Sequence, residues 1–149
     1  MPDPTKAQVA MARDFLDRAD RRLRGAATAA ARLDAEPGEF DNNFDGVVAG
    51  IFHIVDAYEL VTTGIKRHAR EAEQATRIQS VLAQLRAART PDVPPGSRLI
   101  DLNRRRNTSV HGEWTEVIDQ DALEDAIRAA RDFLAAVRYA LASRGVDDT

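Results

Sequence analysis

The stretch FDGVVAGIFHIVDAYELVTTGI, residues 44–65, carries the broadest apolar stripe of the chain. Its apolar side chains recur every three or four residues, which is the period of one face of a helix. They are Phe44, Val47, Val48, Ile51, Ile54, Val55, Tyr58, Val61 and Ile65. We predict a helix here and expect it to be the most buried one. Asp41 to Asn43 precede it and are good capping residues, so we place its start there.

The segment before this stretch has its own helical pattern. Apolar residues spaced three and four apart form a narrow seam between Thr5 and Asp34, namely Val9, Ala12, Leu16, Ala19, Leu23, Ala26, Ala30 and Leu33. Such a seam packs either in a core or against a second chain. Pro37-Gly38 then ends the helix. We predict a first helix over residues 5–34.

The segment after it divides into three further helices. One unbroken helix as far as Pro91 is too long for a compact domain, so we place a break between Gly64 and Ala72. A third helix then runs to about Arg89, and the proline-rich segment 90–96 is a loop. Ser97 is expected to cap a fourth helix, with Gly112 just past its end. Residues 113–120 connect it to a final helix that Asp121 caps and Gly145 closes.

These elements predict an all-α, up-and-down bundle of four to five helices. The whole chain of 149 residues forms one domain, because that length supports a single core and no linker-like composition divides it. No strand pattern interrupts the helical periods.

Composition excludes several function classes. The chain has no cysteine, which rules out disulfides, thiolate metal sites and cysteine nucleophiles. Its three histidines lack the spacing of a zinc site, and no glycine-rich phosphate loop is present, so we expect no metal and no cofactor. No apolar run approaches the roughly 20 residues of a membrane span. The first residues lack the features of a signal peptide, so we expect a cytoplasmic protein with no membrane partner.

The stretch Arg106-Asn107-Thr108-Ser109-Val110-His111 is the one that points to chemistry. An arginine guanidinium holds its charge at any working pH and presents donors that fit phosphate oxygens. A histidine exchanges protons near neutral pH. Together these groups suit the cleavage of a phosphodiester without a metal. The net charge of −3 means that nucleic-acid binding would depend on a local patch. The run Arg104 to Arg106, taken alone, is more typical of a solvated face.

Helix geometry limits how these groups can meet. Asn107 and His111 share a face, whereas Arg106 lies about 140° away from His111 around an ideal helix. The arginine can wrap around the helix, the helix can unwind near Gly112, or two copies can meet across a twofold axis. The third arrangement would bring both histidines and both arginines into one cleft.

The arginine, asparagine and histidine of this stretch resemble the R-x4-6-H motif of the higher eukaryote and prokaryote nucleotide-binding (HEPN) superfamily. The form R-N-x-x-x-H is similar to that of bacterial HEPN toxins and defence proteins. The resemblance implies a small helical bundle, a homodimer with a shared cleft, and metal-independent cleavage of RNA to a 2′,3′-cyclic phosphate.

The resemblance also implies roles for individual residues. His111 is the general base or acid, Arg106 binds and stabilises the scissile phosphate, and Asn107 helps to hold the pair. Arg104 and Arg105 add positive charge for substrate binding. Asp45 or Asn43 would match a polar residue near the start of an earlier helix.

One departure from the family pattern keeps an alternative open. Toxins that a nucleotidyltransferase antitoxin controls often have a tyrosine two residues after the histidine, where this chain has Glu113. The resemblance still implies a partner antitoxin, either a nucleotidyltransferase or another protein. A non-catalytic helical dimer that binds nucleotide, RNA or protein is the alternative, and a plain scaffold bundle is the third reading.

Overall fold

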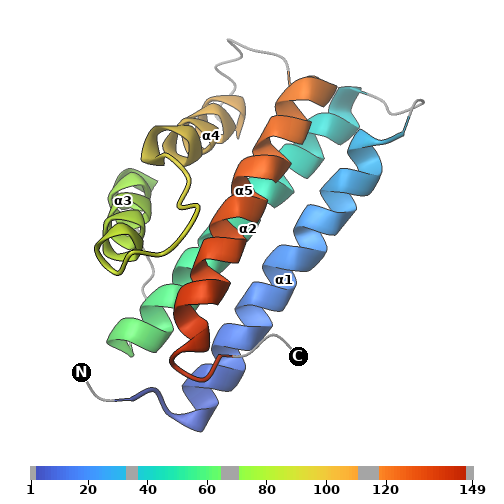
Figure 1. Cartoon of the computed structure of the whole chain (residues 1–149). Helices are drawn as coiled ribbons and strands as arrows, with labels where there is room; N and C mark the ends of the chain where they lie inside the picture. Colours follow the sequence, from blue (N-terminus) through green and yellow to red (C-terminus); the bar gives the residue numbers. More distant parts are fainter. Residues whose placement is uncertain (1–2, 33–36, 65–70, 111–117, 147–149) are drawn as a thin grey trace.

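Five helices make up the described part of the chain (Figure 1). The computed structural model describes residues 3–32, 37–64, 71–110 and 118–146, and for residues 37–38, 71–73 and 106–110 it describes the backbone alone. The helices are α1 (Lys6–Ala30), α2 (Pro37–Thr63), α3 (Glu71–Ala87), α4 (Gly96–Val110) and α5 (Gln120–Ala142). No strand occurs in these ranges, so the predicted all-α class is confirmed.

Three long helices and one short pair form the bundle. α1 runs antiparallel to α5, because the Gln120 side chain donates to the Ala30 carbonyl at one end and Arg13 reaches the Gly145 carbonyl at the other. α1 is also antiparallel to α2, since Arg32 pairs with Glu39 across their connection. The α3–α4 pair returns the chain along the bundle, and within the described residues it contacts α2 and α5 but not α1.

α1 begins with a capping box. The Thr5 hydroxyl accepts from the Gln8 backbone N–H, and the Gln8 side chain accepts from the Thr5 backbone N–H. The predicted seam of α1 is buried against α2 and α5 from Ala12 to Ala30, whereas Val9 is partly buried and Leu33 lies outside the described residues. Its small residues permit a close approach, because a Cβ added at Gly50 of α2 would lie 3.7 Å from the Ala19 Cα. The seam therefore serves the core.

α2 follows the predicted apolar stripe, and Phe44, Val47, Ile51 and Ile54 are buried. It starts at Pro37 instead of at Asp41 to Asn43 as predicted. Proline suits the first position of a helix, because its fixed φ is already helical and the N–H that it lacks has no partner there. The predicted break after Gly64 is confirmed, since this glycine has a φ of +74°.

Four other predicted boundaries differ from the structure. α1 ends at Ala30, with Ala31 as its C-cap, and not near Asp34. α3 ends at Ala87, two residues before Arg89, whose φ of +59° is not helical. α4 starts at Gly96, so Ser97 lies inside the helix and does not cap it. The cap of α5 is Asp119 and not Asp121, because the Asp119 carboxylate accepts from the Ala122 N–H at 2.8 Å. Gly145 closes the last helix as predicted, with a φ of +89°.

The buried apolar side chains of all five helices form one continuous core, which extends to Ile118 and Val146. None of the described helices combines the length and the apolar character that crossing a bilayer requires.

Candidate functional site

α4 carries the segment that the sequence singled out. Its helical backbone includes Arg106 and Asn107, which lie in its last turns, but their side chains are outside the described set. His111 follows the last residue of α4 and lies outside the described residues. Two of the three predicted catalytic residues therefore lie on α4, and the mutual geometry of all three side chains stays a prediction.

Arg105 docks the end of α4 onto α2. Its guanidinium carbon lies 5.8 Å from the centroid of the Phe44 ring, which is within the range of a cation–π contact. Asn43 and Asp45 flank this phenylalanine on α2. The contact joins Arg105 to the turn of α2 that carries both predicted substrate-binding residues, and the roles of all three in binding stay predictions.

The polar groups on this part of α2 are tied into the helix or half-buried. The Asn43 amide donates to the Glu39 carbonyl at 2.7 Å, which fixes the side chain along the preceding turn. Asp45 is partly buried, and the Asp41 Oδ1 is buried with no hydrogen-bond partner among the described residues. A buried oxygen without a donor is uncommon in folded proteins. This end of α2 therefore has acceptor capacity that the described fold does not use.

Asn103 is a site residue that the sequence reasoning missed. Its side chain is only 5% exposed, and its Oδ1 has no hydrogen-bond partner among the described residues. Asn103 lies one turn before Asn107 in the register of α4, and His111 follows at the same spacing. A line of asparagine, asparagine and histidine at steps of four was the signal that the sequence offered.

The two described arginines of the 104–106 run point in different directions. The Arg104 side chain is 75% exposed and pairs with Asp101 one turn back on α4. Arg105 instead lies over Phe44. Arg104 is thus solvent-exposed and Arg105 packs on α2, so these two residues do not form one solvated face.

A second charged cluster, also missed, joins α3 to α2. Arg77 Nη2 lies 2.7 Å from Asp56 Oδ1, and Arg77 Nε lies 2.8 Å from Glu59 Oε1. Burial lowers the pKa of Arg77, but the hydrogen bonds and charges of both carboxylates outweigh it and raise the pKa above its ordinary value. This cluster holds α3 in place. Both of its carboxylates belong to α2, so the cluster links α3 and α2 and does not include α4.

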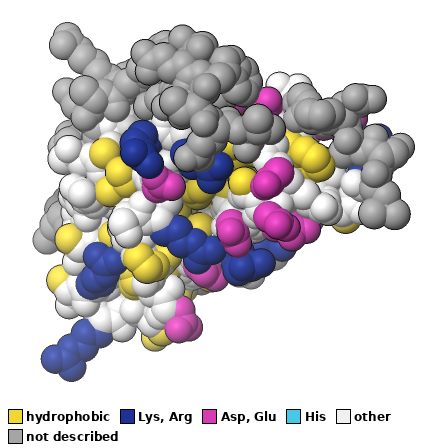
Figure 2. Space-filling view, turned by 90° about the horizontal axis from the view of Figure 1, so that it is seen from above, with side chains coloured by type: hydrophobic (Ala, Val, Ile, Leu, Met, Phe, Trp, Pro, Cys, Tyr) yellow, Lys and Arg dark blue, Asp and Glu magenta, His cyan; other side chains and the backbone are white. Residues whose placement is uncertain are grey.

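The described residues contain no group of three or more histidine, aspartate or glutamate side chains arranged to hold a metal ion. The end of α4 lies at the same end of the bundle as the starts of α2 and α5 (Figure 1). Figure 2 looks onto this end and shows basic and acidic side chains interspersed. The described part of this end therefore shows no broad field of one sign.

Comparison of the chain with models of known protein families, with curated proteins and with solved structures finds no match in any of the three.

Proposed function

We propose that this protein is a metal-independent endoribonuclease of the HEPN type. The site consists of Arg106, Asn107 and His111 at the end of α4, supported by Arg105 from the same helix and by Asn43 and Asp45 from α2. Its biological role would be that of a toxin in a toxin–antitoxin pair or of a related defence protein.

The contact between Arg105 and Phe44 is the observation that carries the proposal. It fixes the end of α4 against the start of α2, two segments that are far apart in the sequence. The sequence resemblance implies a polar residue near the start of an earlier helix, and Asn43 and Asp45 flank the phenylalanine that Arg105 contacts on α2. The catalytic segment is thereby anchored next to a fixed helix, as positioning of reacting groups demands.

The chemistry needs only groups that the chain supplies. His111 takes the proton of the ribose 2′-hydroxyl, whose oxygen then attacks the adjacent phosphorus. The bond from phosphorus to the 5′-oxygen breaks, and that oxygen receives the proton back from the imidazolium that His111 became in the first step. Arg106 stabilises the charge that develops on the phosphate oxygens. The products are a 2′,3′-cyclic phosphate and a free 5′-hydroxyl.

Cleavage of RNA in excess EDTA tests this proposal. The wild-type protein is expected to cut RNA to fragments that end in 2′,3′-cyclic phosphate and to leave DNA of the same sequence intact. His111→Ala and Arg106→Ala should each lower the rate by at least about a hundredfold, which is typical for loss of an acid–base group or a charge-stabilising group.

Arg18→Ala is the matched control, because Arg18 is an exposed arginine of α1, a helix that does not contact α4 within the described residues. It should keep full activity. If both site variants retain wild-type cleavage while their melting temperatures fall, the motif is structural and the nuclease proposal is wrong. If the wild-type protein binds RNA but never cuts it, the non-catalytic binding dimer replaces the nuclease.

A further inference from the structure

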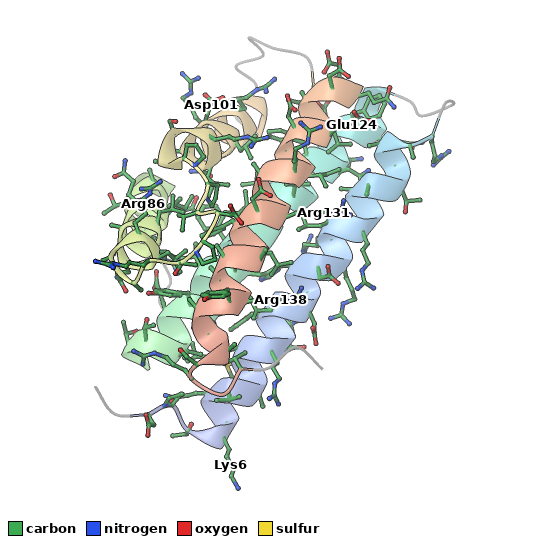
Figure 3. All side chains as sticks on the ribbon, viewed as in Figure 1. Lys6, Arg86, Asp101, Glu124, Arg131 and Arg138 are labelled. Carbon is green, nitrogen blue, oxygen red and sulfur yellow. The ribbon has the colours of Figure 1, made fainter. Side chains whose placement is uncertain are left out.

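A groove separates α3 from α4 on the part of the bundle that does not contact α1. It encloses a volume of about 460 Å³, which lies within the range of small-molecule sites. Arg86 enters it from α3, and Arg104 enters it from α4. Figure 3 labels Arg86 on α3 and Asp101 on α4, the two short helices that border the groove.

The two arginines give the α3–α4 groove a positive wall on each side. Arg86 Nη2 donates to the Pro94 carbonyl at 3.0 Å, which orients the guanidinium and uses one of its five N–H donors. Asp101 also lines the groove and pairs with Arg104. Two arginines and one carboxylate leave the lining with one net positive charge. A single phosphate group matches that charge and the fork of donors of Arg86.

The floor of the α3–α4 groove is apolar. Leu82 is fully buried, and Ile100 is partly buried against the core. Gln79 and Ser97 add neutral hydrogen-bonding groups at the rim. A nucleotide combines a phosphate with a flat base that has apolar faces and a polar edge, so each part of it meets a matching part of the groove.

The α3–α4 groove also adjoins the proposed catalytic segment. Arg104 lies three residues before Asn107 in the register of α4, on the same side of the helix and about 4.5 Å away along its axis. A strand with one phosphate at Arg104 therefore has its neighbouring phosphate within reach of the end of α4.

We propose that the α3–α4 groove holds one nucleotide of the RNA strand that is cut at the end of α4. Its phosphate lies between Arg86 and Arg104, and its base packs on the exposed part of Ile100, beneath which Leu82 is buried. This assignment rests on the proposed ribonuclease function and adds Arg86, from a helix that the motif does not include, to the residues that bind substrate.

Binding of a labelled RNA oligonucleotide to the His111→Ala protein, measured by fluorescence anisotropy at several salt concentrations, tests the assignment. Adding Arg86→Gln is expected to weaken binding by about tenfold or more, because a hydrogen bond to a charged group is lost. The slope of log K against log salt should become shallower by about one, because one phosphate contact disappears. Arg89→Gln, which changes an exposed arginine just past α3 and outside the groove, should change neither quantity.

A second variant separates binding from folding. Ser97→Asp places a carboxylate in the α3–α4 groove and in the first turn of α4, which has no acidic residue. The new charge should stabilise the helix while it repels the phosphate, so we expect weaker RNA binding with an unchanged or higher melting temperature. Ser97→Asn is the control at the same position, because asparagine has nearly the size of aspartate but no charge, and it should bind RNA more tightly than Ser97→Asp does.

The other possible results of these binding experiments separate the groove assignment from the ribonuclease proposal. RNA binding that neither Arg86→Gln nor Ser97→Asp weakens overturns the groove assignment and leaves the ribonuclease proposal intact. Failure of the His111→Ala protein to bind any RNA, together with an inert wild-type protein, overturns both.

A third arm of the experiment uses adenosine monophosphate alone. If it binds as tightly as the oligonucleotide and loses affinity with Arg86→Gln, the groove binds a free nucleotide and the strand assignment is wrong.

Discussion

Asn103 is the most deeply buried polar side chain among the described residues, and its Oδ1 lacks a donor there. A leucine of similar size removes that unsatisfied oxygen, so Asn103→Leu should raise the free energy of unfolding by about 1 kcal/mol. We expect the same change to slow RNA cleavage, because stability given up at a buried polar group is typical of functional sites. Urea denaturation and the cleavage assay measure the two effects. Lower stability would mean that the amide has a partner and serves the fold.

The ionisation of Tyr58 makes the free energy of unfolding depend on pH in the alkaline range. Burial raises the pKa of Tyr58 above its ordinary value of 10.0, and the charge of Arg144 offsets part of that rise. The unfolded chain therefore ionises this phenol at a lower pH than the folded chain does. Its contribution to stability is complete below pH 10 and is lost as the pH rises through the folded-state pKa.

Tyr58→Phe should accordingly lose stability less steeply than the wild-type protein above pH 10. The variant also lacks the hydrogen bond to Gln84 Oε1, 3.1 Å long, so its stability near neutral pH should be somewhat lower. Denaturation series from pH 8 to 11, as an approximate working range, measure both effects. Tyr139→Phe is the control, because that tyrosine is 64% exposed, and it should keep the wild-type slope.

Helix boundaries show what local sequence predicts and what it leaves open. Periodicity placed the five helices and the break at Gly64, because apolar spacing follows directly from helix geometry. The choice between Asp119 and Asp121 as the cap of α5 depends on the backbone conformation at each residue. Asp119 has the extended backbone that lets its carboxylate reach the Ala122 N–H. Two aspartates two residues apart offer equal capping chemistry, and only the chain path selects one.

Because Asp119 caps α5 and Asp121 lies in its first turn, the same substitution at the two positions should lower stability by unequal amounts. Asp119→Ala removes the cap and should lower the free energy of unfolding by about 1 kcal/mol. Asp121→Ala removes only the interaction of a first-turn carboxylate with the helix dipole and should lower it by no more than about 0.5 kcal/mol. Thermal or urea unfolding of both variants measures the pair. Equal losses would show that the two carboxylates share the end of α5.

At the scale of the whole molecule, the sequence could predict the residues of the candidate site but not the contacts between helices that lie around it. The motif residues were recognised from their types and spacing. The contact of Arg105 with Phe44, and the entry of Arg86 into the α3–α4 groove, join segments that no local pattern relates. Such contacts arise from how helices pack around the common core, and packing is not a property of any one segment.

The end of α4 lies at one end of the bundle, so two copies joined there through a twofold axis would bring their motifs together. In that arrangement Arg106 of one copy completes the site of the His111 of the other. Mixing the inactive Arg106→Ala and His111→Ala proteins then restores activity, because a mixed dimer contains one site with both groups intact and one with neither. With equal mixing, half of the dimers are mixed and each has one working site, so about a quarter of the wild-type rate should return. If both groups of a site belong to one chain, every site in the mixture lacks one of them and no activity returns. The measured recovery therefore distinguishes a shared cleft from two independent sites, and it does so without any knowledge of the RNA target.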